Sequence, residues 1–254
     1  MKLIQSMIIA FSMYSKLPMP VIEWKKENMK YVMCFFPAVG MVSGVLTYLL
    51  GRAFLYMSFG RLFFAAAMTL LPILVSGGIH LDGFMDTMDA LSSYGDREKK
   101  LEILKDSHSG AFAVLGLGCY LVWSLGVWSE VTSDMLGVIG CIFVVSRALS
   151  AVAVVSFRPA KNSGLARTFQ DGARKTAVRI FMTGYLVAAA VVMFWLSPVQ
   201  AGCALASAGM VFVYYRHICY HQFGGVTGDL AGYFLQVCEL AMLTAVMAGG
   251  KLWS

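Results

Sequence analysis

The sequence predicts an all-α, polytopic integral membrane protein, a single domain over residues 1–254 with about seven transmembrane helices and an N-terminal amphipathic helix. Of the 254 residues, 59% are hydrophobic and only 13% are charged, and the mean hydropathy is +0.72. A soluble domain is about 25% charged because its surface faces water. Several apolar runs also reach the length of about 20 residues that a helix needs to cross a bilayer. Lipid must therefore cover much of the surface.

The first helix is expected over residues 2–14. Apolar side chains such as Leu3, Met7 and Phe11 recur with helical spacing and define one face. A helix of this kind lies in the membrane interface or packs against a bundle. No small-x-small cleavage site follows it, so we expect a retained helix rather than a signal peptide.

Seven apolar runs of spanning length follow. They occupy residues 31–50, 61–79, 111–129, 135–156, 180–197, 199–215 and 231–249. Gly40 and Gly44 in the first run have the GxxxG spacing that lets two helices approach closely. The runs predict seven spans packed in one bundle.

Most of the 20 Lys and Arg residues fall in alternate loops. Positively charged loops are retained in the cytoplasm. We therefore expect a multi-pass protein of a prokaryotic cytoplasmic (inner) membrane, with a cytoplasmic N-terminus and cytoplasmic loops over 77–110, 157–179 and 216–230. Such loops account for the net charge of +6, so we expect no nucleic acid partner. The six cysteines lack CxxC spacing and predict neither disulfides nor a zinc site.

An acidic motif at the end of the second run is the strongest chemical signal. Asp82, Asp86 and Asp89 are spaced i, i+4, i+7, so on a helix they share one face, where like charges repel. A bound cation turns that repulsion into ligation, and Mg²⁺ prefers carboxylate and phosphate oxygens. The alternative is a solvated acidic loop. Apolar residues between the aspartates, such as Phe84 and Met88, argue against it because they give the opposite face a packing surface.

Charged residues near other spans are further candidates. Lys105 and Asp106 directly precede the third predicted span, where desolvated charges need partners; they either complete the acidic site or hold phosphate. Arg147 lies in the middle of the fourth predicted span and has to face the bundle interior. Two interpretations, a structural ion pair and a phosphate ligand, are equally supported for it.

A glycine-rich segment, Gly224-Gly225-Val226-Thr227-Gly228-Asp229, precedes the last predicted span. Glycines allow close backbone approach, and exposed N–H groups can cradle an anion. Taken alone, the segment is equally typical of a tight turn. Glu239 lies inside the last predicted span, where a carboxylate indicates a functional site.

Together these elements resemble the cobalamin synthase family, the adenosylcobinamide-GDP ribazoletransferases of the late cobalamin pathway. The resemblance covers nearly the whole chain, and its acidic and glycine-rich motifs are specific in combination. The matching segments, in chain order, are Ser15-Lys16-Leu17-Pro18-Met19-Pro20; Gly78-Ile79-His80-Leu81-Asp82-Gly83 with Asp86 and Asp89; Leu101-Glu102-Ile103-Leu104-Lys105-Asp106-Ser107; Arg147; Ser163-Gly164-Leu165; and Gly224-Gly225-Val226-Thr227-Gly228-Asp229 with Glu239.

The resemblance implies that α-ribazole or its 5′-phosphate attacks the activated phosphate of adenosylcobinamide-GDP, releasing GMP and forming adenosylcobalamin or its 5′-phosphate. On this basis we assign Mg²⁺ to Asp82 and Asp86, with Asp89 as third ligand or base, and catalytic roles to Lys105 and Asp106. Substrate contacts are expected from His80, Arg147, Ser163, Gly164, Gly224, Gly225, Thr227, Asp229 and Glu239. The resemblance leaves room for a homo-oligomer and for association with other cobalamin-pathway enzymes on the lipid bilayer.

Other functional classes share some of these features. A membrane prenyltransferase or CDP-alcohol phosphotransferase would use a similar aspartate motif on a lipid diphosphate. Such an enzyme should carry a second acidic motif of the same kind, whereas this chain has the glycine-rich segment 224–229. A transporter would place its charges near the membrane midplane on broken helices. Here most candidate residues lie at span ends, which favours an enzyme.

Overall fold

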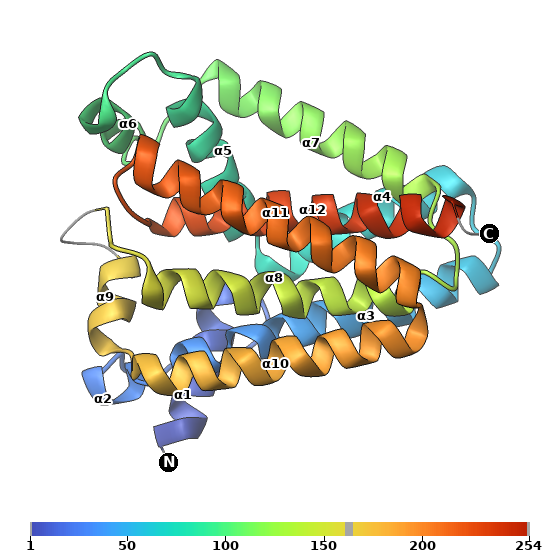
Figure 1. Cartoon of the computed structure of the whole chain (residues 1–254), viewed down its shortest axis with the longest axis horizontal. Helices are drawn as coiled ribbons and strands as arrows, with labels where there is room; N and C mark the ends of the chain where they lie inside the picture. The colour runs from blue at the N-terminus through green and yellow to red at the C-terminus, as the bar shows by residue number, and fades with distance from the viewer. Residues whose placement is uncertain (1, 161–164, 253–254) are drawn as a thin grey trace.

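The computed structural model describes residues 2–160 and 165–252 of the protein as an elongated bundle of helices (Figure 1). Across these residues the only extended pairing is a single bridge between Pro159 and Val226, so the all-α prediction is confirmed. The helices that run along the bundle are α3 (Phe36–Tyr56), α4 (Arg61–Ser76), α7 (Ala111–Ser129), α8 (Leu136–Ser156), α10 (Lys175–Leu196), α11 (Pro198–Gln222) and α12 (Gly228–Leu252).

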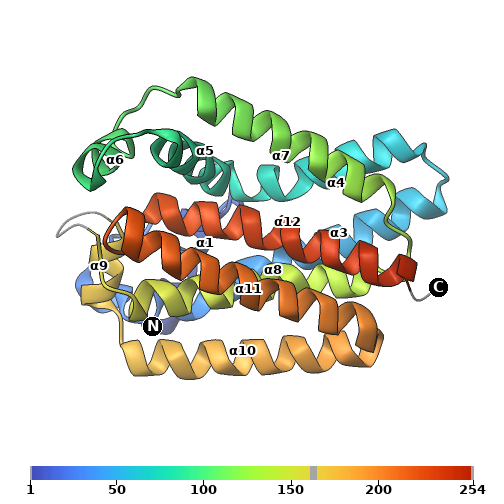
Figure 2. The same ribbon diagram turned by 45° about the horizontal axis from the view of Figure 1, so that its top comes forward.

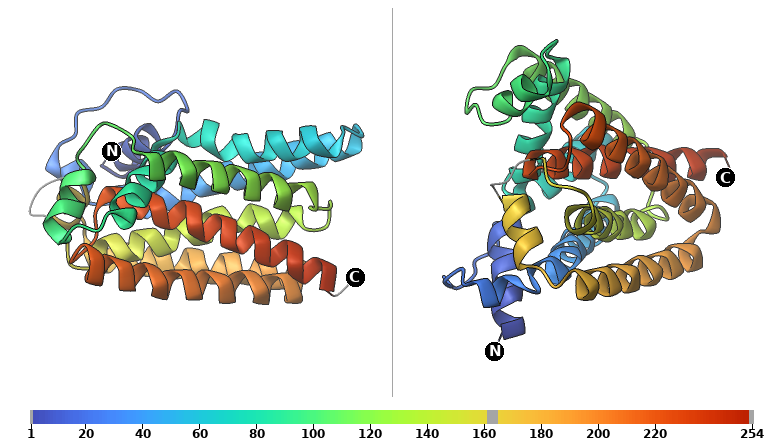
Figure 3. Two further views of the ribbon diagram at one scale, coloured as in Figure 1. Left: turned by 90° about the horizontal axis from the view of Figure 1, so that it is seen from above. Right: turned by 60° about the vertical axis from the view of Figure 1, so that its left-hand side comes forward.

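The shorter elements gather at one end of the bundle, on the left in Figures 1 and 2. They are α1 (Lys2–Tyr14), α2 (Lys26–Met29), η1 (Val32–Phe35), α5 (Ile79–Ser92), α6 (Arg97–Ile103) and α9 (Leu165–Gly172). The connections α3–α4, α7–α8 and α10–α11 lie at the opposite end (Figure 3). The described parts of the three loops predicted to share a face therefore do meet at one end, which we call the α5 end.

The predicted spans match the helices in most cases. Five stretches are long and apolar enough to cross a membrane: Val32–Tyr56, Ala111–Ser129, Leu136–Ser156, Lys175–Leu196 and Gly228–Leu252. The bent pair α4–α5 makes a sixth crossing if it is counted as one span. α11 covers the remaining predicted run and has 25 residues, but it is not among these stretches. Its last turns carry Arg216, His217 and His221.

α8 forms the centre of the bundle, and most of its side chains are buried. α3 packs against it through Gly40 and Gly44. A Cβ at Gly40 would overlap the carbonyl oxygen of Phe143, and one at Gly44 would overlap that of Gly140. The close helix approach predicted from the GxxxG spacing is therefore confirmed.

α4 ends at two glycines that redirect the chain. Gly77 and Gly78 have φ values of 66° and 81°, in the left-handed region that glycine adopts at little cost. The axis turns by 97° here, so α5 does not continue along α4 but runs across the end of the bundle (Figure 3). Lys16 N–H donates to the Val75 carbonyl at 2.8 Å, and the Lys16 side chain packs on Gly77.

Candidate active site

α5 and the first turns of α12 cross in direct backbone contact. A Cβ at Gly83 would lie 2.7 Å from the Asp229 carbonyl oxygen, and one at Gly232 would lie 2.9 Å from that of His80. Only glycine permits this approach, because any side chain would separate the helices. The crossing brings Asp82 and Asp86 of α5 close to Asp229 of α12. Two motifs almost 150 residues apart in sequence thus form one acidic face.

The electrostatics of Asp86 reflect this crowding. Partial burial and the neighbouring charges of Asp82, Asp229 and Asp89 raise the pKa of Asp86 to about 6. Desolvation and like charges both disfavour the ionised carboxyl group. The predicted sharing of one helix face by Asp82, Asp86 and Asp89 is therefore confirmed, and Asp229 joins it from a second helix.

Asp89 holds the start of α7. Its Oδ2 accepts a hydrogen bond from Gly110 N–H at 2.5 Å, and its Oδ1 accepts one from Ala113 N–H at 2.8 Å. These amides belong to the N-cap residue and the first turn of α7, where no intrahelical acceptor exists and the helix dipole favours an anion. A carboxylate 21 residues upstream therefore caps this helix. The roles of metal ligand or base predicted for Asp89 stay predictions, and any such role would be added to this one.

The donor set of the acidic face suits a hard cation. Carboxylate oxygens are the ligands that Mg²⁺ prefers, and Mg²⁺ is often held by one or two carboxylates together with substrate phosphates. Over residues 2–160 and 165–252, no three His, Cys, Asp or Glu side chains are grouped closely enough to hold one ion by themselves.

Three segments converge beside the acidic face. The Arg158 carbonyl accepts from Val226 N–H at 2.8 Å, and Ala160 N–H donates to the Val226 carbonyl at 3.0 Å. Arg158 Nε also donates to the Gly224 carbonyl at 3.1 Å. Arg97 of α6 lies against Gly224, where any Cβ would overlap its guanidinium. The glycine-rich segment is thus a tight turn bordered by two guanidinium groups.

Other predicted residues have local partners. Thr227 caps α12, its Oγ1 accepting from Leu230 N–H at 3.1 Å. Asp106 accepts from the backbone N–H of His108 at 3.0 Å and lies 2.7 Å from its Nδ1. These hydrogen bonds lower the pKa of Asp106. Lys105 is exposed in the same α6–α7 loop, so it lies at the α5 end as predicted.

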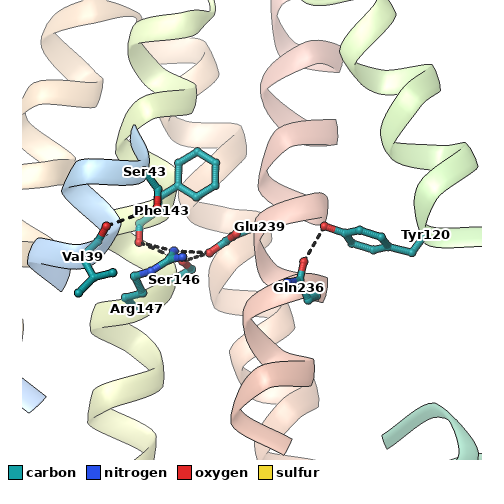
Figure 4. A network of polar contacts seen from close by, with 8 residues as sticks. All are labelled: Val39, Ser43, Tyr120, Phe143, Ser146, Arg147, Gln236 and Glu239. Atoms are coloured by element: carbon teal, nitrogen blue, oxygen red, sulfur yellow. Dashed lines mark hydrogen bonds and ion pairs between the residues drawn. The ribbon is translucent and has the colours of Figure 1, made fainter. Parts of the chain in front are cut away.

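Arg147 and Glu239 form a pair inside the bundle, between α8 and α12 (Figure 4). Arg147 Nη1 lies 2.5 Å from Glu239 Oε1, which also accepts from Ser146 Oγ at 2.7 Å. Arg147 is 1% exposed and Glu239 is 8% exposed. Of the two interpretations left open for Arg147, this geometry favours the structural ion pair. The substrate contacts predicted for both residues stay predictions.

The structure places residues near the site that the sequence did not single out, and it does not describe two of the predicted residues. Ser163 and Gly164 lie outside the described residues. Arg97 and Arg158 were not among the predicted site residues, because their proximity to Gly224 depends on long-range folding. A cavity of about 290 Å³ adjoins the acidic face, and besides residues of α5 and α12 its walls include Tyr14, Phe36 and Phe169, which were not among the predicted site residues.

Comparison with known proteins points to the same family as these motifs. The family model described as cobalamin-5-phosphate synthase matches residues 6–247. An adenosylcobinamide-GDP ribazoletransferase from Lachnoclostridium phytofermentans is 47% identical over 253 residues, covering 99% of this chain and 97% of the relative. Proteins of the same name from Clostridium perfringens strain SM101 and Carboxydothermus hydrogenoformans are each 31% identical, covering 91% and 96% of this chain and 92% and 97% of their own.

No solved structure matches the chain. The family match spans both the acidic helix α5 and the glycine-rich turn before α12, and each relative is covered over nearly its whole length. The chain belongs to the cobalamin-5-phosphate synthase family.

Proposed function

We propose that the protein transfers the adenosylcobinamide phosphate group of adenosylcobinamide-GDP to α-ribazole or α-ribazole 5′-phosphate, with release of GMP. The observation that carries the proposal is the crossing of α5 and α12, which joins the acidic motif and the glycine-rich segment in one site. The names of the relatives give the substrates. A hydroxyl oxygen of the acceptor forms a bond to phosphorus, and the bond to the GMP oxygen breaks.

Mg²⁺ is the cofactor that the acidic face fits. In this proposal Asp82 and Asp86 hold it, with Asp89 and Asp229 close by. When bound, Mg²⁺ neutralises charge on the diphosphate, which is the main requirement of a phosphoryl transfer. The paired carboxylates are otherwise mutually repulsive, so cation binding relieves an unfavourable arrangement.

The protein's own groups orient the diphosphate. The N-terminal turns of α5 and α12 both lie at the crossing, and helix N-termini favour anions. The guanidinium groups of Arg97 and Arg158 border the glycine-rich turn and would attract the nucleotide. Asp89 has a positioning role, because its hydrogen bonds fix the start of α7 against α5.

The setting proposed for this reaction is the cytoplasmic face of a prokaryotic inner membrane. The basic loops support this orientation because Lys and Arg are retained on the cytoplasmic side. Nucleotide substrates would then reach the α5 end from the cytosol. Self-association and association with other cobalamin-pathway enzymes stay predictions.

The test is product formation by purified protein in nanodiscs. Adenosylcobinamide-GDP and α-ribazole 5′-phosphate are supplied with Mg²⁺ or with EDTA, and GMP and the corrinoid are followed by mass spectrometry. We expect GMP and the joined corrinoid in equal amounts, with Mg²⁺ only. Absence of a joined corrinoid, together with transfer to or from a CDP- or prenyl-linked lipid, would overturn the proposal.

A further inference from the structure

The cavity beside the acidic face is bounded by helices from most of the chain. Its volume is about 290 Å³, just below the range of about 300–1,000 Å³ for sites that hold drug-sized molecules. Asp82 and Asp229 line it, so it opens onto the same carboxylates that we assign to the reaction. It is too small for a corrin ring with its side chains and fits a much smaller molecule.

Aromatic rings form the wall around His80. The Tyr14 and His80 ring centroids lie 6.1 Å apart with planes at 23°, and the Phe36 ring lies 6.0 Å from His80, edge on. Phe169 of α9 lies 6.3 Å from Tyr14. All four residues line the cavity. Rings arranged in this way offer stacking and edge contacts to a planar aromatic group.

Two side chains that line the cavity each carry a buried polar atom without a hydrogen-bond partner within the described residues. The atoms are Nε2 of His80 and Oγ of Ser150, in side chains that are 5% and 1% exposed. Buried polar groups in native proteins are nearly always paired, because an unpaired one loses its hydration without compensation. Two such side chains lining one aromatic-walled cavity therefore indicate a ligand with hydrogen-bonding groups.

We propose that this cavity binds the planar base of the acceptor nucleoside, with His80 and Ser150 as its specificity-determining hydrogen-bonding residues. The inference rests on the proposed function, since that function supplies the acceptor. A heteroaromatic base has flat apolar faces for Tyr14, Phe36 and Phe169 and a ring nitrogen for the imidazole. With the base inside, the ribose lies at the opening beside Asp82 and Asp229, where its hydroxyl can meet the diphosphate.

The test separates the two substrates kinetically. The KM for α-ribazole and the KM for adenosylcobinamide-GDP are measured for Ser150→Ala and His80→Phe, each with the other substrate saturating. Loss of one hydrogen bond weakens binding by about 3- to 10-fold. We expect the KM for α-ribazole to rise by that factor, while the KM for adenosylcobinamide-GDP stays within twofold of wild type.

Thr47→Val is the matched control. Thr47 is a fully buried α3 residue whose Oγ1 also lacks a partner within the described residues, and it is not among the side chains that line this cavity. Removing its hydroxyl should leave both KM values unchanged. A second substrate tests His80 directly: an acceptor with a C–H group in place of the free ring nitrogen should bind wild type about 3- to 10-fold more weakly. His80→Phe should no longer distinguish the two acceptors.

Two results would overturn the inference while leaving the proposed function intact. One is an unchanged α-ribazole KM in both variants, as expected if only water fills the cavity. The other is an equal rise in both KM values, which indicates a structural role. Failure of the proposed function is recognised separately, because wild-type protein would then form no joined product from α-ribazole.

Discussion

Removing Glu239 should destabilise the protein more than removing its partner Arg147. The two groups meet at 2.5 Å inside the bundle and are 8% and 1% exposed, so solvent screening is small. Breaking a buried pair by removing one partner costs about 3–5 kcal/mol. Glu239→Leu leaves a guanidinium that cannot lose its proton. Arg147→Met leaves a carboxylate that can be neutralised by a proton, so its cost should fall at or below the lower end of that range.

Replacing both residues should recover most of the lost stability. In the double variant Arg147→Met, Glu239→Leu no buried charge remains, and such replacements are often close to neutral. The free energy of unfolding is measured by circular dichroism in mixed micelles titrated with SDS, for wild type, both single variants and the double variant. We expect a coupling energy of about 2–4 kcal/mol between the two sites.

The activity of the double variant decides whether Arg147 also binds substrate. A structural pair predicts that correctly folded double variant keeps its KM for adenosylcobinamide-GDP. A stable double variant with that KM raised by tenfold or more would refute the reasoning and assign Arg147 to a substrate phosphate. Equal destabilisation by both single variants would refute the argument from proton neutralisation.

Two further predictions concern the helix contacts that build the site. Gly83→Ala should reduce transfer activity by more than tenfold, because its Cβ would lie 2.7 Å from the Asp229 carbonyl, whereas Gly118→Ala, with open space around it, should keep activity; equal activity of the two variants would contradict the crossing. Asp89→Ala should lower the free energy of unfolding by about 0.5–2 kcal/mol through loss of the α7 cap, and Asp89→Asn, which keeps an acceptor oxygen, should lose less; SDS titration measures both, and unchanged stability of Asp89→Ala would contradict the cap.

Local sequence patterns predicted the positions of the helices well. Three features depend on the spacing of residues within one helix, and that spacing can be read from the sequence. They are the amphipathic N-terminal helix, the GxxxG contact of Gly40 and Gly44, and the shared face of Asp82 and Asp86. The basic loops also met at one end, since alternating spans leave alternate loops together.

Contacts between distant segments could not be predicted in the same way. Asp89 caps a helix 21 residues later, and Arg147 pairs with a carboxylate 92 residues away. Each depends on how the helices cross, which is set by backbone contacts such as those of Gly83. The walls of the small cavity, including Tyr14 and Phe169, come from amphipathic helices whose aromatic residues look like ordinary packing in sequence.

We propose that the carboxylates at the α5–α12 crossing hold the metal that supports transfer. The most direct measurement is Mg²⁺-dependent GMP release from adenosylcobinamide-GDP and α-ribazole by Asp82→Asn and Asp86→Asn. Asp134→Asn, at the opposite end of the bundle, is the control. We predict a loss of about 100-fold or more in each α5 variant, with unchanged unfolding and a normal rate in the control. Either α5 variant releasing GMP within tenfold of wild type would contradict the claim.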